Sequence, residues 1–381
     1  MNMRLSVERW GAFFDKPHLE LAEHLRAKSK TILEYNADHS GKTAALKMGQ
    51  ELDVYKYLCP KDGGLDLRAL VLVREALGFL SPLADGIFAV QGLGTYPISQ
   101  FGNQSQRDAL DDFRTGKKIA GFALTEPNAG SDVASMTTHY TKSEGGYRLN
   151  GEKVFISNAT IADQFVVFAT QEPGAGKKGI SAFCVAKDAP GLTIEETALG
   201  IEHPVGKLFF KDCKVPSSAL LGNPGEGYNI AMATLSKFRV TVGAAAVGMA
   251  ERAFVEARAH VCTREQFGKP LSSQQLVKGY LAEMATLIEA SRGLVLNAAK
   301  AADDGQEDIT LAAAKAKLFS TESAQKVIDM GVQLFGGLGV TKGNPVEELY
   351  RAIRPLRIYE GTSEIQKLII GSQVVKEWRA M

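Results

Sequence analysis

The stretch Leu356-Arg357-Ile358-Tyr359-Glu360-Gly361-Thr362-Ser363-Glu364-Ile365-Gln366 places one carboxylate, Glu360, between an aromatic residue and a glycine. Gly361 predicts the end of one helix, and Thr362 or Ser363 is a typical N-cap for the apolar run that follows. Glu360 would then lie at an interhelical turn, where a loop side chain can face a cavity. On local pattern alone a solvated glutamate is the commoner outcome, because glutamate side chains are mostly exposed.

The length and net charge of the chain limit its number of domains and its classes of binding partner. With 381 residues, the chain can form two or three domains with substantial cores. The net charge is +1, from 44 basic and 43 acidic residues, so the sequence carries no electrostatic footprint for nucleic acid or for an anionic membrane. Any bound phosphate must therefore meet local basic groups and helix N-termini.

The cysteines and histidines show no pattern of a metal site or of a disulfide framework. The four cysteines form no CxxC pair, and the six histidines have no ligand spacing. Without a recognisable signal peptide, this pattern favours a reducing, cytoplasmic compartment. No uninterrupted apolar run is long enough to span a bilayer, so we expect neither a bound metal nor a membrane partner.

Three segments of the chain differ in their patterning. Residues 1–117 and 223–381 show helical periodicity, whereas residues 118–222 consist of short apolar runs separated by glycine and proline. In the first segment, Asp66 is placed to cap a buried helix over residues 67–77. The sequence therefore predicts an α+β multidomain protein, with an N-terminal helical domain, a middle β-domain and a C-terminal helical bundle.

The middle segment predicts a small antiparallel β-domain, either a barrel or a sandwich. Residues 147–156 alternate in polarity around Asn150-Gly151, the dipeptide most typical of a two-residue hairpin turn. In the C-terminal segment, long helices with glycine-rich connections predict an antiparallel four-helix bundle. One helical stripe there consists of Leu276, Val277, Tyr280, Leu281, Met284, Leu287 and Ile288.

The segment from Ile358 to Gln366 resembles the C-terminal signature of the acyl-CoA dehydrogenases, whose α–β–α domain order is the order predicted here. The resemblance covers nearly the full chain. It implies FAD as the cofactor, an acyl-CoA thioester as the substrate, and Glu360 as the base that removes the α-proton while the flavin takes the β-hydride. Burial between substrate and flavin is then expected to raise the pKa of Glu360 toward neutrality.

Two segments of the middle domain resemble the flavin-binding segments of that family. Residues 122–132 form a small-residue loop after a strand, which taken alone is as readily an ordinary β-loop. Residues 155–158 end another strand, and Phe155 stands where the family often has tryptophan. The resemblance assigns flavin contacts to Phe122, Leu124, Thr125, Gly130, Ser131, Phe155, Ile156 and Ser157.

Further segments resemble those with which one subunit of the family reaches the FAD of another. By themselves, Arg264 would be a surface residue in a turn, and Gly336-Gly337 would be a helix C-cap. No strand–GxGxxG–helix unit typical of a Rossmann site is present. The resemblance assigns cofactor contacts to Arg264, Phe267, Gln275, Gln333, Gly336, Gly337, Thr362 and Glu364, and it implies a homotetramer built of dimers, with a homodimer as the alternative.

The resemblance assigns substrate contacts to Ser131, Phe238, Arg239, Tyr359 and Gly361. The first bundle helix departs from the family pattern Asp-x-x-Arg, because Ser236 takes the place of the acid. A carrier-protein thioester therefore stays open as an alternative to acyl-CoA. Phe238 holds the position at which isovaleryl-type relatives place the base, which leaves Glu360 as the one candidate at either position.

The reaction implied by the resemblance gives a trans-2-enoyl thioester and passes electrons to an electron-transfer flavoprotein. Two rival functions use the same fold: an oxygen-reactive oxidase or monooxygenase, and a non-dehydrogenating member that binds a macromolecule. The intact Glu360 and the near-neutral charge argue against the second rival, whereas the rate at which air reoxidises the reduced enzyme separates the first rival from a dehydrogenase. The acyl group is set by a pocket expected near residues 84–96, whose depth the sequence does not give.

Overall fold

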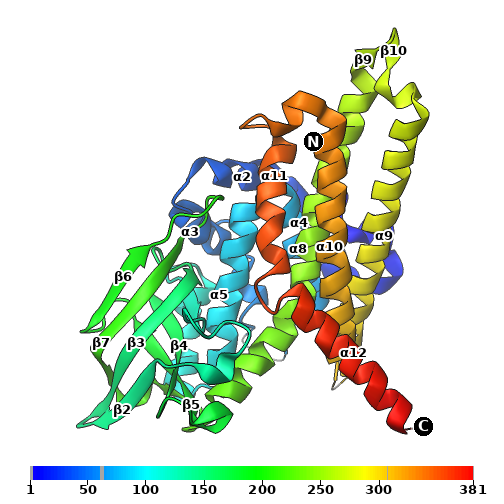
Figure 1. Cartoon of the computed structure of the whole chain (residues 1–381). Helices are drawn as coiled ribbons and strands as arrows, with labels where there is room; N and C mark the ends of the chain where they lie inside the picture. The colour runs from blue at the N-terminus through cyan, green and yellow to red at the C-terminus, as the bar shows by residue number, and fades with distance from the viewer. Residues whose placement is uncertain (1–2, 61–63, 307, 381) are drawn as a thin grey trace. The chain divides into compact units, whose positions relative to one another are not determined.

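The computed structural model describes residues 3–60, 64–306 and 308–380, and Figure 1 shows its elements. Helices come first, strands occupy the middle of the chain and helices return after them, which confirms the predicted fold class. The α-helices before the strands are α1 (Lys16–Ala27), α2 (Ser29–Glu34), α3 (Lys42–Gln50), α4 (Leu67–Leu80), α5 (Pro82–Phe101), α6 (Gln104–Asp108) and α7 (Leu110–Arg114). Asp66 caps α4 as predicted, since its carboxylate accepts a hydrogen bond from the Ala69 N–H at 2.9 Å.

The middle segment forms one eight-stranded sheet. Its strands are β1 (Ala120–Ala123), β2 (His139–Ser143), β3 (Gly146–Ser157), β4 (Gln164–Thr170), β5 (Ile180–Ala186), β6 (Leu192–Glu196), β7 (Val205–Pro216) and β8 (Leu220–Leu221). The strand order is β6-β7-β3-β2-β4-β5-β8, with β1 paired to β4. Most pairs are antiparallel, as expected, but β1 and β2 each pair with β4 in parallel, so the sheet is mixed.

The hairpin expected at Asn150-Gly151 is wrong. Strand β3 runs straight through this dipeptide, and its pairing with β7 shifts register between Leu149 and Gly151, as at a β-bulge. The hairpin turn lies instead at Glu144-Gly145, between β2 and β3. The glycine at 151 serves close packing, because a Cβ there would lie 2.5 Å from the Thr138 Oγ1.

The C-terminal segment contains α8 (Gly227–Thr263), α9 (Gln275–Asp303), α10 (Thr310–Phe335), α11 (Pro345–Ile353) and α12 (Ser363–Ala380). The short hairpin of β9 (Glu265–Gln266) and β10 (Lys269–Pro270) connects α8 to α9. Side chains of α8, α9, α10 and α11 share one apolar core. By length and hydropathy α8 could cross a membrane, but 72% of its apolar window is buried inside the protein, as in an ordinary core helix.

The stripe predicted on α9 is only partly buried. Met284 and Ile288 lie in the core, whereas Leu276 is 83% exposed and Tyr280 is also exposed. Periodicity identified the helix face correctly. The N-terminal turns of this face are apolar surface on the single chain, which fits a helix that contacts another molecule.

By compactness the chain divides into two units. We call Met1–Leu33, Asp66–Asp85 and Arg239–Met381 the bundle unit, and Glu34–Leu65 and Gly86–Phe238 the sheet unit. The division falls within α5 and within α8. The domain borders expected near residues 117 and 222 mark the change between helices and strands, whereas the two units are defined by compactness. The expected borders therefore stay a prediction.

Candidate active site

Glu360 lies in a tight turn of the bundle unit, between a 3-10 helix (Arg354–Arg357) and α12. Its backbone is left-handed, with φ 54°, and Gly361 follows with φ 90°. This conformation costs a non-glycine residue about 1–3 kcal/mol, and it persists where the surroundings fix it, often at functional sites. Thr362 Oγ1 accepts a hydrogen bond from the Ile365 N–H at 3.3 Å, which confirms the predicted turn and N-cap.

The turn is held by side chains of two helices. The Lys317 Nζ, on α10, donates hydrogen bonds to the carbonyl oxygen of Tyr359 at 2.9 Å and to that of Gly361. The Gln366 Nε2, on α12, also donates to the Gly361 carbonyl, at 2.8 Å. Both carbonyls that flank Glu360 are therefore fixed by buried donors.

One oxygen of the Glu360 carboxylate is desolvated. Its Oε2 is shielded from solvent and has no hydrogen-bond partner among the described residues. Burial raises the pKa of Glu360, and the positive charges of Arg74, Lys317 and Arg239 reduce but do not cancel that rise. A desolvated carboxylate with a raised pKa is a stronger base than one in water.

A second buried network adjoins the turn. The Arg74 guanidinium, on α4, donates to both carboxylate oxygens of Asp85 at 2.9 and 2.8 Å and to the Thr241 Oγ1 at 3.1 Å. Arg74 also hydrogen-bonds the side chain of Tyr359, and burial raises the pKa of that phenol. Tyr359, the aromatic residue directly before Glu360, therefore contacts an arginine that a bidentate ion pair holds in place.

Sequence reasoning missed Arg74, Asp85 and Lys317. Arg74 and Asp85 are each 1% exposed and Lys317 is 0% exposed. The available signal was a charged residue in an apolar helical run, because such residues are buried only when they are paired.

The predicted substrate residues fall in both units. Arg239 lies in the bundle unit beside the turn: a Cβ on Gly361 would lie 3.8 Å from its Nη2. Arg239 is 7% exposed, and its Nε has no hydrogen-bond partner in the described chain. The structure therefore brings Arg239, Tyr359, Glu360 and Gly361 together. In the sheet unit, Phe238 packs edge-on against Tyr96 with 5.8 Å between ring centroids, and Ser131 is exposed.

In the sheet unit, the two segments predicted to bind flavin lie side by side. The Val154 N–H donates to the Thr125 carbonyl at 2.9 Å, which joins the loop after β1 to the end of β3. The Phe155 backbone is left-handed, with φ 55°, and its side chain is 65% exposed. An exposed aromatic ring beside the partly accessible Thr125 and Ser157 fits a planar ring with polar edges, as in a flavin.

The remaining members of these segments have mixed environments. Phe122 packs with its ring centroid 5.0 Å from that of Phe168, and Leu124 and Ile156 are buried. These three side chains anchor the loops in the sheet core. Gly130 is exposed, and apart from its chain neighbours no residue that the structure describes has an atom within 4 Å of the position a Cβ would take, so its backbone is open to a ligand.

A buried ion pair supports the loop after β1 that is predicted to bind flavin. The Lys153 Nζ donates to the Glu126 Oε1 at 2.7 Å and to the Leu124 carbonyl at 3.0 Å. The Glu126 carboxylate also accepts from the backbone N–H groups of Thr137 and Thr138, at 2.6 and 3.0 Å. Burial lowers the pKa of Lys153 to about 8, against the attraction of Glu126. The loop is thus fixed by contacts between strands, which sequence reasoning did not foresee.

The cofactor residues predicted in the bundle unit lie at its surface. Phe267 is 92% exposed at φ 55°, and among the described residues, the chain neighbours apart, no atom lies within 4 Å of a Cβ at Gly336 or Gly337. Thr362 is partly buried as the cap of α12. The other exposed positions of this set are Arg264, Gln275, Gln333 and Glu364. Their exposure fits contact with a second molecule, and their role in FAD binding stays a prediction.

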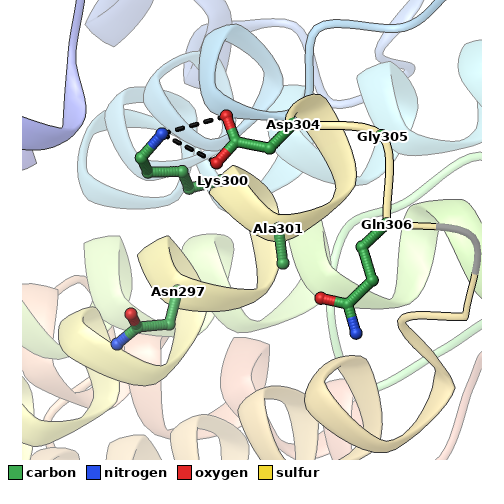
Figure 2. A pocket seen from close by; sticks show the side chains of 6 residues that line it. All are labelled: Asn297, Lys300, Ala301, Asp304, Gly305 and Gln306. Atoms are coloured by element: carbon green, nitrogen blue, oxygen red, sulfur yellow. Dashed lines mark hydrogen bonds and ion pairs between the residues drawn. The ribbon is translucent and has the colours of Figure 1, made fainter.

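An open surface hollow of about 490 Å³ lies at the C-terminal end of α9 (Figure 2). In it the Lys300 ammonium binds both oxygens of Asp304, at 2.8 and 2.9 Å. None of the predicted site residues lines this hollow. Its solvated ion pair is an ordinary helix contact rather than a reactive group.

Two family models match the chain: the acyl-CoA dehydrogenase middle domain over residues 121–213 and the C-terminal domain over residues 225–375. An acyl-CoA dehydrogenase of Bacillus subtilis (strain 168) is 39% identical over 317 residues, covering 82% of this chain and 83% of that protein. The butyryl-CoA dehydrogenase structure from Megasphaera elsdenii matches with TM-score 0.88 and 30% identity, over 98% of this chain and 100% of that chain.

Two further solved structures are similar. A chain from the structure of the electron transferring flavoprotein of Acidaminococcus fermentans matches with TM-score 0.90 and 32% identity, over 95% of this chain and 98% of that chain. The structure of PigA with FAD and proline matches with TM-score 0.87 and 28% identity, over the same shares of the two chains. The chain thus belongs to the acyl-CoA dehydrogenase family and is an FAD-dependent oxidoreductase that acts on acyl-CoA.

Proposed function

We propose that this protein dehydrogenates a saturated acyl-CoA between Cα and Cβ and produces the trans-2-enoyl-CoA. The observation that carries the proposal is the Glu360 carboxylate. Its buried Oε2 has no hydrogen-bond partner within the described residues, and the carbonyls on both sides of it are fixed. A rigid, desolvated carboxylate is the group required to remove a weakly acidic proton.

Glu360 takes the α-proton, and its backbone N–H is assigned as a donor to the thioester oxygen. This hydrogen bond is needed because enolate charge develops on that oxygen as the proton leaves. FAD, when bound, supplies the acceptor for the β-hydride. The substrate thus loses one proton and one hydride, and the electron pair of the α-C–H bond becomes the new double bond. Arg239 and Gly361 are assigned to the substrate side of the turn, beside Glu360.

We assign the exposed cofactor residues of the bundle unit, such as Arg264 and Gly336, to contacts with the FAD of another subunit in a homotetramer built of dimers. Arg264 supplies a charge for the diphosphate, and the open backbone at Gly336 and Gly337 allows close approach to it. An electron-transfer flavoprotein is the proposed electron acceptor. The similarity to a chain from a structure of such a flavoprotein supports that assignment.

A panel of acyl-CoA thioesters tests the activity. Holoenzyme is mixed anaerobically with straight, branched and cyclic saturated acyl-CoAs, while the flavin absorbance is recorded and the thioester products are analysed by mass. At least one thioester should bleach the flavin and lose two mass units. The corresponding carrier-protein thioesters form a second arm, because Ser236 replaces the acid of the family pattern. Protein that retains FAD but is bleached by neither class would contradict the proposal, and bleaching by the carrier-protein thioesters alone would replace acyl-CoA as the substrate.

A further inference from the structure

Lys317 is buried at an unusual place. It lies on α10, its side chain is 0% exposed, and its Nζ donates to the two carbonyl oxygens that flank Glu360. Lysine is almost never fully buried unless it is paired. Here the hydrogen-bond acceptors of the ammonium are backbone carbonyls of the catalytic turn rather than a carboxylate.

Burying the Lys317 ammonium costs folding free energy, because the charged form loses its hydration. Burial lowers the pKa of Lys317 to about 8, and the carboxylate of Glu360 counteracts part of that effect. The other charged groups near Lys317 are Arg239, which opposes its charge, and Glu322 and Glu364, which favour it. Glu322 is itself paired with Arg357 at 2.7 Å and accepts from the Ser363 Oγ at 2.5 Å, so Glu360 is the nearby acid without a hydrogen-bond partner at Oε2. An apolar side chain at position 317 would fill the helix interface without this cost.

The hydrogen bonds of Lys317 and its positive charge act on Glu360 in different ways. The hydrogen bonds fix the carbonyls before and after a residue whose left-handed backbone, at φ 54°, is intrinsically unfavourable. The positive charge favours the ionised form of the Glu360 carboxylate, which is the form that accepts a proton.

We propose that Lys317 is a positioning residue of the reaction, which holds the left-handed Glu360 turn and keeps its carboxylate ionised. This inference rests on the proposed role of Glu360 as the base. It goes beyond that role because it assigns a catalytic purpose to a side chain that does not touch the reacting atoms.

Two substitutions separate the contributions of Lys317. Lys317→Met removes the hydrogen bonds and the charge, whereas Lys317→Gln removes the charge and keeps an amide donor. Lys315→Met is the matched control, because Lys315 lies on the same helix and is exposed. For each variant we would measure FAD content, hydrogen exchange of the peptide spanning residues 355–366, and anaerobic flavin reduction from pH 5.5 to 9.

Lys317→Met should retain FAD and a KM within about threefold of the parent, while saturated flavin reduction at pH 7 falls by roughly tenfold to a hundredfold. The acid limb of its pH–rate profile should move up by about one pH unit, because Glu360 loses a stabilising cation. Lys317→Gln should show the same shift with a smaller loss of rate. Hydrogen exchange in residues 355–366 should accelerate in Lys317→Met and stay at the parent rate in Lys315→Met.

Several results would overturn the inference. If the acid limb of the pH–rate profile lies at the parent pH in both Lys317 variants, Lys317 has no electrostatic role. If Lys317→Met reduces its flavin at the rate of the parent, Lys317 has no positioning role. If neither variant folds and binds FAD, Lys317 is a structural residue of the bundle and the proposal is wrong. Glu360→Gln is measured in parallel: activity in that variant would refute the proposed base, whereas its inactivity beside a parent-like Lys317→Met refutes only the present inference.

Discussion

Arg74 and Asp85 form a fully buried ion pair that supports Tyr359, the aromatic residue next to the proposed base. Their bidentate contact, at 2.8 and 2.9 Å, satisfies both carboxylate oxygens of Asp85, and the remaining guanidinium donors reach Thr241 and Tyr359. Removing one member leaves the other charge buried without its partner, which is far more costly than removing both. The pair therefore acts as a unit within the bundle unit.

A double-mutant cycle tests this coupling. Arg74→Leu and Asp85→Leu should each lower the free energy of unfolding by about 3–5 kcal/mol, whereas the double variant should lose much less than the sum. Urea unfolding measures all three variants. The exposed Lys300–Asp304 pair in Figure 2 is the control, and its Lys300→Met variant should change stability by less than about 1 kcal/mol. Additive losses at 74 and 85 would show that the pair is not coupled.

At the scale of elements, predictability depended on how local the determining interaction was. The Glu360 turn and the caps at Asp66 and Thr362 were predictable, because a few neighbouring residues fix them. The hairpin at Asn150-Gly151 failed, because packing against Thr138 and the pairing with β7 decide that glycine. The burial of Lys317 had a sequence signal, but its contact with the turn could not be predicted, because the hydrogen bond to the Tyr359 carbonyl joins residues 42 apart in the sequence.

One element contact predicts a pH dependence of stability. The His203 imidazole, just before β7, lies against Gly86 of α5, where a Cβ would be 2.6 Å from its Cε1. Burial lowers the pKa of His203 to about 4, whereas the unfolded value is about 6.5. The unfolded chain therefore binds more protons between these values. The resulting stability is fully present above pH 6.5 and is lost as the pH falls toward 4.

Urea unfolding at two pH values measures this effect. Between pH 7.5 and pH 5, the parent should lose about 2 kcal/mol of unfolding free energy through His203, and His203→Asn should lose correspondingly less. His39→Asn is the control, since the His39 side chain is 73% exposed and pairs with Glu202 at the surface. An equal pH-dependent loss in the parent and in His203→Asn would contradict this assignment.

At the scale of the whole molecule, the proposed site requires more than one chain. Surface residues of the bundle unit, including Phe267 and Leu276, expose apolar area that an oligomer would cover. The proposed FAD contacts at Arg264 and Gly336 also lie at the surface. Subunit association and cofactor binding are therefore expected to be linked, because a ligand held by two chains stabilises their association.

Complementation between subunits tests this arrangement. Arg264→Ala alone and Ser131→Trp alone should each weaken FAD binding, because the first removes a phosphate charge and the second fills the open loop. Co-expressed, the two variants should recover a fraction of full-affinity sites, since some sites combine the intact sheet unit of one chain with the intact Arg264 of another. Light scattering should report the tetramer. No recovery in mixed oligomers would contradict FAD contacts between subunits.

The role of Glu360 as the base is tested most directly by anaerobic flavin reduction in Glu360→Gln holoenzyme with the best acyl-CoA substrate. This change keeps the shape of the side chain and removes the proton acceptor, so the variant should bind FAD and substrate yet reduce its flavin at least about a thousandfold more slowly. Glu348→Gln, at an exposed glutamate of α11, should reduce its flavin at the parent rate. Flavin reduction by Glu360→Gln at close to the parent rate would contradict the assignment of Glu360 as the base and the mechanism built on it.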